Sequence, residues 1–356
     1  MVGDNMEMKQ FKATKYVAPK TKKRLVNIFW TVLFPLIGIA FFGAAGGFGD
    51  LGNSLIRNDL ILTMVTVLIA CFALNTNLNS GRMDFSLGAV GVLGCVIAWN
   101  VIPNKAMPNF AILFLFLSIL FGMILGLLSG LLFVTLKIPA IVVSLGVCLI
   151  YEGFAYVLSN GEGSIEMPGD IAPDLYPTIT NPWFIAIVTI VIAVFMLLAL
   201  KYSKFGHDKL TLLYGQKVAV DTGVNEIKNA LICYTLAGAL IAIYTFIVSA
   251  NLVKIQVSTN LGSAMTVMAN FLPIFLGGLI AKHSNEVIGL MLGVFSVTLF
   301  KDSLNRFGLT NSNISLITSI LIFIILTYMV NWANWVRIIK NKIKNYKLQK
   351  FEGKNN

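Results

Sequence analysis

Long apolar stretches, separated by short polar segments, run through the chain from about residue 26 to residue 335. About 20 consecutive apolar residues form a helix long enough to cross a lipid bilayer. The pattern therefore predicts an all-α fold, a polytopic membrane bundle of about ten transmembrane helices. The expected spans are 26–45, 59–75, 84–101, 109–136, 139–158, 182–201, 230–250, 264–281, 286–300 and 313–335.

Basic residues gather at both ends of the chain, where residues 1–25 and 336–356 each carry seven Lys or Arg. We interpret these segments as basic cytoplasmic tails on either side of one transmembrane domain, 26–335. With the N-terminus inside and the spans alternating, 22 of the 27 Lys and Arg fall on the inner side and five on the outer side. This positive-inside bias predicts that both termini are cytoplasmic.

Composition supports a membrane protein and argues against several other classes. Apolar residues make up 57% of the chain and charged residues 12%, against about 45–50% and about 25% in soluble domains. The net charge of +11 lies mostly in the tails, which indicates orientation in a lipid membrane rather than nucleic-acid binding. No phosphate-cradling G-x-x-x-x-G-K-[ST] loop occurs, so any ATP would be bound by partner subunits.

Catalytic and metal-binding patterns are not found. The two histidines, His207 and His283, fall in predicted inner loops, and no paired acids or Cys-x-x-Cys motif appears. We therefore expect a transporter with no catalytic residue, no metal site and no cofactor of its own. An intramembrane enzyme is disfavoured.

Two polar interruptions predict broken helices. Residues 75–84 are polar between two apolar runs, and Pro273 is followed by Gly277 and Gly278. Non-helical backbone at membrane depth survives only against protein or a water-filled cavity, although capping within an ordinary short loop would also explain the first stretch. The predicted path or gate residues are Asn75, Asn79, Asp84, Ser86, Asn270 and Pro273.

Glu152 is the only ionisable residue well inside a predicted span. A charge at the bilayer centre costs about 2.5–3.5 kcal/mol on insertion scales. Because Glu152 lies about two turns from the outer end of its span, we predict a carboxylate that reaches solvent.

Glycines recur at helical spacing in the fourth span, at Gly122, Gly126 and Gly130, and predict close helix contacts. The segments 126–136 (GLLSGLLFVTL) and 289–299 (GLMLGVFSVTL) share six of eleven residues. In the predicted topology they run in opposite directions, as inverted repeats of transporters do, so an inverted repeat is possible here alongside coincidence.

Two loops carry unusual polar patterns. The inner-loop segment 214–228 predicts a short amphipathic helix, with Gly223 as its C-terminal cap and Asn225 as the N-cap of the next span. Such a helix fits a lipid anchor or a docking surface equally well. The outer loop 159–181 is acidic, and we interpret it either as a docking site for a binding protein or as a solvated loop. Its acidic residues are Glu162, Glu166, Asp170 and Asp174.

Three segments, in order, resemble ribose-type permeases of ATP-binding cassette (ABC) importers. Residues 80–89 (SGRMDFSLGA) resemble GGIDLSVGA, and residues 126–146 (GLLSGLLFVTLKIPAIVVSLG) resemble GLxNGxLVxxLKIPPFIVTLG. Residues 214–238 (YGQKVAVDTGVNEIKNALICYTLAG) resemble the coupling segment of these permeases. The resemblance covers about residues 55–330.

This resemblance implies a multi-pass permease in the plasma membrane of a prokaryote, importing a sugar or related polar solute. Its expected partners are two cytoplasmic ATPase subunits or one fused ATPase, a second permease copy or paralogue, an extracytoplasmic binding protein and membrane lipid. The match implies that the coupling segment docks to the ATPase. The predicted coupling residues are Gly215, Lys217, Ala219, Asp221, Gly223 and Lys228.

Departures from the family pattern keep alternatives open. Arg82 stands in place of a glycine, and residues 266–270 lack the acids that the family often has there. A nucleoside or branched-chain amino-acid permease of the same class, or a diverged half of a heterodimer, therefore remains an alternative. An ion-coupled secondary transporter is a further rival, with Asp84 and Glu152 as its candidate ion-binding residues.

Overall fold

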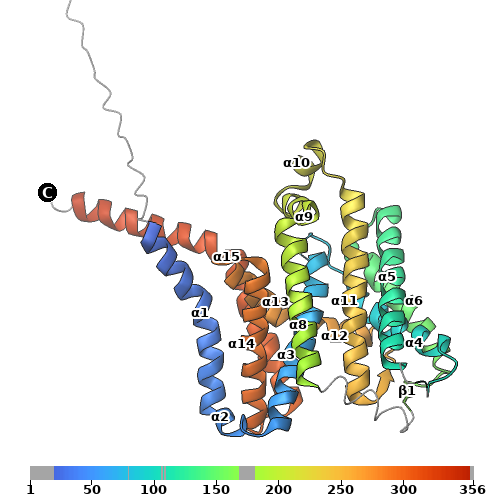
Figure 1. Cartoon of the computed structure of the whole chain (residues 1–356). Coiled ribbons are helices and arrows are strands. Elements are labelled where there is room, and N and C mark those ends of the chain that lie inside the picture. Colours follow the sequence, from blue (N-terminus) through green and yellow to red (C-terminus); the bar gives the residue numbers. More distant parts are fainter. Residues whose placement is uncertain (1–19, 79, 106, 108–109, 168–180, 353–356) are drawn as a thin grey trace, which may run out of the picture.

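The computed structural model describes residues 20–78, 80–105, 107, 110–167 and 181–352. Helices make up most of this part of the chain, and most of them stand side by side (Figure 1). In chain order the elements are α1 (Lys20–Ala44), α2 (Gly47–Asp50), α3 (Ser54–Leu78), α4 (Leu87–Val101), α5 (Phe110–Leu136), α6 (Ala140–Leu158), β1 (Ser164–Glu166), α8 (Pro182–Leu197), η1 (Leu198–Tyr202), α9 (Lys204–Tyr214), α10 (Gln216–Asp221), α11 (Glu226–Leu252), β2 (Lys254–Gln256), α12 (Gly262–Met268), α13 (Phe271–Ala281), α14 (Glu286–Arg306) and α15 (Asn311–Glu352).

The predicted spans correspond to helices, but two of them differ from full crossings. Among the described residues, eight helices are long and apolar enough to cross a membrane, or nine if the bent pair 187–202 and 204–213 counts as one span. The predicted span 182–201 belongs to this pair, which bends by 65°. The predicted span 84–101 is the 15-residue helix α4, about 22 Å long at 1.5 Å per residue and so shorter than the hydrocarbon layer. The chain is thus a polytopic membrane protein with at least one helix too short to cross the hydrocarbon layer.

The two ends of the bundle are distinguished by different loops (Figure 1). One end carries α9 and α10, and we refer to it as the α10 end. The other carries a two-stranded antiparallel sheet of β1 and β2, with Ile165 opposite Ile255 and Glu166 opposite Lys254, and we refer to it as the sheet end. These two three-residue strands are the one addition to the predicted all-α fold in the described part of the chain.

Small residues bring the central helices into backbone contact, as the glycine spacing predicts. A Cβ atom built on Gly126 would lie 2.4 Å from the Tyr234 carbonyl oxygen, and one on Gly238 would lie 2.2 Å from the Gly122 carbonyl oxygen. Helices α5 and α11 therefore touch through their backbones. Most buried apolar side chains form one cluster around this contact, with further contributions from α3, α4 and α6.

The two similar segments lie in α5 and α14, and their helices run in opposite directions. Near the end of α5, Phe133 stacks on Tyr234, which lies early in α11. At the start of α14, Glu286 pairs with Lys209 of α9. Helix α5 therefore ends, and α14 begins, at the α10 end, which confirms the predicted directions and leaves common origin of the segments as a prediction.

The described part of the basic C-terminal segment is helical. Helix α15 continues from the predicted last span to Glu352, and its C-terminal part extends away from the bundle (Figure 1). At the other end of the chain, α1 begins at Lys20, inside the segment predicted as an N-terminal tail.

Candidate functional site

The first predicted break lies between α3 and α4, where the Asp84 carboxylate is buried and organises the chain. Its Oδ1 atom accepts hydrogen bonds from the Ser86 backbone N–H (2.9 Å) and hydroxyl (2.6 Å). Its Oδ2 atom accepts one from the Asn77 side-chain amide (3.0 Å). Because this turn occupies residues 84–86, helix α4 begins at Leu87, three residues later than predicted. Asp84 therefore lies in the turn that precedes α4 and is not part of the helix itself.

The second break lies between α12 and α13, at Ala269 and Asn270. The prediction that Pro273 marks the break is wrong by three residues, since Pro273 lies in the first turn of α13. Proline is tolerated there because the first helical N–H groups have no partner within the helix. The Asn270 side-chain amide donates to the Thr266 carbonyl oxygen (3.0 Å) and covers one carbonyl that the break exposes.

The two breaks meet inside the bundle. The rings of Phe85 and Phe271 lie 6.1 Å apart. A Cβ atom on Gly88 would lie 2.3 Å from the Ser263 carbonyl oxygen, so the starts of α4 and α12 are in backbone contact. The structure therefore brings Asp84 and Ser86 close to the α12–α13 break, whereas Asn79 lies outside the described residues.

Glu152 of α6 is buried, with an exposed fraction of 3%. Its carboxylate accepts hydrogen bonds from the Leu261 N–H (2.8 Å), the Ser263 N–H (2.8 Å) and the Ser263 hydroxyl (2.5 Å). The prediction of a carboxylate that reaches solvent is therefore wrong. Glu152 lies on the face of α6 that turns inward, and donors from the start of α12 replace water around it. The only sequence signal was its position as the one ionisable residue inside a span.

The turn that Glu152 holds has an unfavourable backbone. Asn260 (φ 57°) and Leu261 (φ 65°) both lie in the left-handed region, which costs a residue with a side chain roughly 1–2 kcal/mol. Such a conformation persists only where the surroundings fix it. The three hydrogen bonds to Glu152 therefore help to fix where α12 begins.

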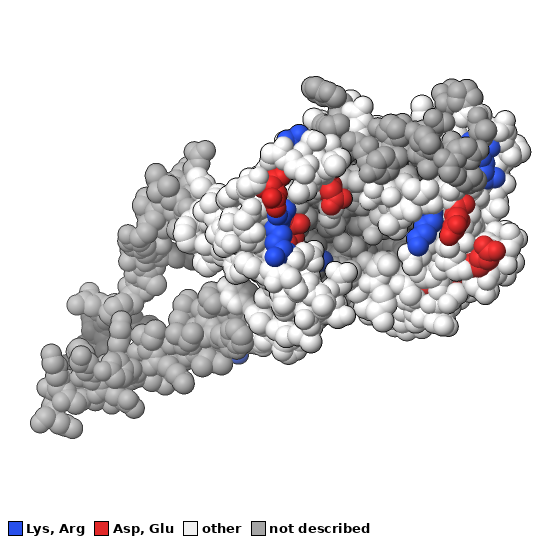
Figure 2. All heavy atoms as spheres, turned by 90° about the horizontal axis from the view of Figure 1, so that it is seen from below, with Lys and Arg blue, Asp and Glu red and all other residues white. Residues whose placement is uncertain are grey.

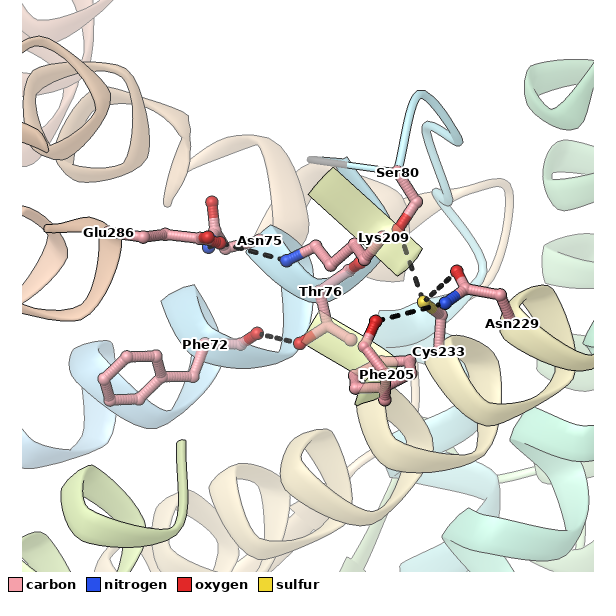
Figure 3. A network of polar contacts seen from close by, with 9 residues as sticks. All are labelled: Phe72, Asn75, Thr76, Ser80, Phe205, Lys209, Asn229, Cys233 and Glu286. Atoms are coloured by element: carbon pink, nitrogen blue, oxygen red, sulfur yellow. Dashed lines mark hydrogen bonds and ion pairs between the residues drawn. The ribbon is translucent and has the colours of Figure 1, made fainter. Parts of the chain in front are cut away.

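A polar network connects the helices at the α10 end (Figure 3). The Asn75 side-chain amide and the Lys209 ammonium group both donate to Oε1 of Glu286, at 2.6 Å and 3.0 Å. These residues come from α3, α9 and α14, and Lys209 has an exposed fraction of only 2%. Asn75 was predicted as a path residue, and the structure places it in this network. Lys209 and Glu286 were missed, since nothing in the sequence distinguishes them from ordinary loop charges.

A second branch of the network ties α9 to α11 and to the end of α3 (Figure 3). The Asn229 side-chain amide donates to the Phe205 carbonyl oxygen (3.3 Å), and the Cys233 thiol donates to the Asn229 side-chain oxygen (3.7 Å). The Ser80 hydroxyl lies 3.3 Å from the Cys233 sulfur and donates to the Thr76 carbonyl oxygen (2.9 Å). Helix α9 is therefore bonded to α11 and α14, and the same network continues to α3.

The inner-loop segment contains a shorter helix than predicted. Helix α10 has six residues, and Gly215 separates it from α9. Gly223 adopts a φ of 90°. The Gly223 N–H donates to the Val220 carbonyl oxygen (2.9 Å) and the Val224 N–H to that of Ala219 (3.0 Å), which is the Schellman arrangement for ending a helix. The predicted C-terminal cap at Gly223 is confirmed.

The remaining predicted coupling residues lie on and around α10. Lys217 and Asp221 are exposed, whereas the Ala219 side chain is fully buried. Lys228 is exposed in the first turn of α11, where its N–H donates to the Asn225 side chain (2.9 Å), and this confirms Asn225 as an N-cap. The segment 215–228 therefore contains a short projecting helix with a capped C-terminal end, followed by the capped start of α11.

At the sheet end, charged side chains are few and a hollow lies among them (Figure 2). Glu162 and Glu166 are exposed there, and Glu166 stands opposite Lys254 in the sheet. Asp170 and Asp174 lie outside the described residues. The docking role of this loop remains a prediction.

Two small cavities lie near the sheet end on either side of Tyr244 of α11. One, of about 170 Å³, is bounded by α4, α11, β2 and α12, and the other, of about 220 Å³, by α3 and α11. The predicted path residues do not line either cavity. No cluster of three or more His, Cys, Asp or Glu that could hold a metal ion is found in the described part of the chain.

Comparison with known proteins places this architecture among transport permeases. Residues 56–327 match the family model described as "Branched-chain amino acid transport system / permease component". The autoinducer 2 import system permease protein LsrC of Escherichia coli (strain K12 / DH10B) is 26% identical over 219 residues, covering 61% of this chain and 62% of that protein. LsrC of Photorhabdus luminescens is 26% identical over 225 residues, covering 63% and 66%.

The chain thus spans about three fifths of the length of the LsrC proteins that it matches. No solved structure matches the chain.

Proposed function

The chain belongs to the family of permease components of branched-chain amino acid transport systems, and from this membership we propose that it is the membrane-spanning subunit of an ATP-driven importer. The match over residues 56–327 carries the proposal. The solute would be a sugar or a related small polar molecule, with nucleosides and branched-chain amino acids as alternatives. Transport would follow alternating access, in which the bundle switches between two packings.

The partners follow from the same proposal. Two cytoplasmic ATPase subunits, or one fused ATPase, would bind the α10 end, and an extracytoplasmic binding protein would deliver solute to the sheet end. A second copy of this chain or a paralogue would complete the transmembrane part. Both termini would then be cytoplasmic in a prokaryotic plasma membrane, in agreement with the 22-to-five distribution of Lys and Arg.

Helix α10 is the proposed contact with the ATPase. It projects from the bundle (Figure 1), and Val218 on its surface has an exposed fraction of 66%. Its companion helix α9 is bonded to α11 and α14, and Glu286 of α14 is bonded in turn to Asn75 of α3. A movement imposed on α10 would therefore reach α3, the helix that precedes the first break.

The ion-coupled alternative is less well supported by the geometry. Its two candidate ion-binding carboxylates, Asp84 and Glu152, each accept at least three hydrogen bonds from neighbouring protein groups. Both carboxylates therefore serve to hold a helix start.

Substitution of Gly223 tests the coupling role. Gly223→Val places a β-branched residue at a φ of 90°, which costs about 1–2 kcal/mol and should disturb the end of α10. Because α10 lies outside the membrane-spanning helices, abundance in the membrane should be unchanged. The partner ATPase should then co-purify poorly or hydrolyse ATP without solute uptake.

Gly146→Val is the matched control, because Gly146 lies on an exposed face of α6 with open space around the added side chain. It should leave both ATPase binding and uptake unchanged. Full uptake by the Gly223→Val protein at normal abundance would contradict the coupling role.

A further inference from the structure

The cavity of about 170 Å³ near the sheet end carries several hydroxyl groups among apolar side chains. Hydroxyl groups line it from three elements, and Gly88 and Val92 of α4 close one side. The hydroxyl-bearing residues include Thr245 and Ser249 of α11, Ser258 after β2, and Ser263 and Thr266 of α12. Buried polar groups are costly unless they have partners or a function.

Three of these hydroxyls direct their hydrogens into the protein. Thr245 donates to the Ile241 carbonyl oxygen (3.0 Å), and Thr266 donates to that of Ser263 (2.6 Å). The Ser263 hydroxyl donates to Glu152 (2.5 Å). Each hydroxyl has one hydrogen and two lone pairs, so what these three groups still offer is acceptor capacity. A ligand rich in O–H donors complements such a lining.

The charges near the cavity are balanced or already engaged. Lys254 is the one charged residue among the described residues that line it, and Glu166 stands opposite Lys254 in the sheet. Glu152 lies behind Ser263 with its oxygens bonded to three donors, so it offers no free counter-ion to an ammonium group. An amino acid or a phosphorylated solute would leave a charge poorly paired here, and a buried unpaired charge is expensive.

We propose that this cavity is a solute-binding site at the sheet end of the transport path, and that it selects a small, neutral, hydroxyl-rich solute. This assignment rests on the proposed function, and it narrows the solute class toward a neutral sugar and away from an amino acid. Tyr244, Val248 and Leu252 separate it from the second cavity of about 220 Å³, which lies beside α3. The two cavities therefore lie next to each other along α11.

A cysteine-labelling experiment tests the assignment directly. Ser258 is half-buried at the edge of the cavity, and the four native cysteines are buried, so Ser258→Cys provides an addressable thiol. Membranes containing the full transporter are treated with a water-soluble thiol reagent, with and without a set of neutral pentoses and hexoses led by D-ribose. At about ten times its dissociation constant, a bound sugar should slow labelling about tenfold. L-leucine and D-ribose 5-phosphate should not slow it.

Two comparisons make the result specific. Glu162→Cys, exposed at the same end of the molecule but outside the cavity, should be labelled at the same rate with and without sugar. Thr245→Val removes one hydrogen-bond acceptor and should raise the dissociation constant of the protecting sugar about tenfold. Thr245→Ser keeps the hydroxyl and should leave the dissociation constant unchanged.

Protection by L-leucine or by the phosphorylated sugar would overturn the assignment, and so would labelling that no neutral sugar slows. These outcomes differ from a failure of the proposed function. If the chain were an ion-coupled carrier, sugars would still slow labelling of the Ser258→Cys thiol, but solute uptake would not depend on ATP. If only the cavity assignment is wrong, ATP-dependent uptake would persist without protection.

Discussion

Replacing Glu286 should destabilise α9 more than replacing its ion-pair partner Lys209. The ammonium nitrogen lies 3.0 Å from the carboxylate oxygen, and the side chains have exposed fractions of 3% for Lys209 and 29% for Glu286. Glu286→Leu leaves a cation buried without its counter-ion, which costs about 3–5 kcal/mol. Lys209→Met leaves a carboxylate that solvent can reach and that Asn75 still bonds, so the cost should be about 1 kcal/mol.

Amide hydrogen exchange in α9 measures this difference, because exchange there reports local opening of the helix. At about 1.4 kcal/mol per tenfold, Glu286→Leu should speed exchange by at least about 100-fold and Lys209→Met by about fivefold. The double variant should resemble Lys209→Met, since the buried charge is gone. Equal effects of the two single changes, or additive effects in the double variant, would refute the reasoning.

Three further changes have defined outcomes. Glu152→Ala leaves one buried and one partly buried N–H donor without their acceptor, at up to about 1–3 kcal/mol each, and should lower the melting temperature of the purified protein by several degrees. An unchanged melting temperature would contradict the buried carboxylate. Gly126→Leu should prevent α5 from packing on α11 and reduce the yield of folded protein, whereas Gly153→Ala, with open space around it, should not. A cysteine at Glu162 should react with an impermeant reagent from outside and one at Lys217 should not, and the reverse would overturn the orientation.

Much of the fold follows from local features of the sequence. A bilayer requires about 20 apolar residues per helix, so the long helices were predictable from the length of each apolar run. The helix boundaries at Gly223 and Asn225 were predictable for a similar reason, because each depends on hydrogen bonds within a few residues. Close contact at Gly126 was also predictable, although its partner helix was not.

The features that escaped prediction depend on contacts between distant parts of the chain. Glu152 bonds residues 109 and 111 positions away, and the sequence does not show which face of α6 turns inward. Lys209 and Glu286 are 77 positions apart and looked like separate loop charges. The break at Asn270 was placed too late because the pattern marks Pro273, whose ring fits the first turn of a helix.

The central claim is that ATP hydrolysed by a partner subunit drives solute across this bundle. The most direct measurement is uptake of a radiolabelled neutral pentose into proteoliposomes that contain the chain with its ATPase and binding protein. The account predicts uptake that requires ATP on the α10 side and continues after proton and sodium gradients are collapsed. Uptake that follows an ion gradient and proceeds without ATP would contradict it.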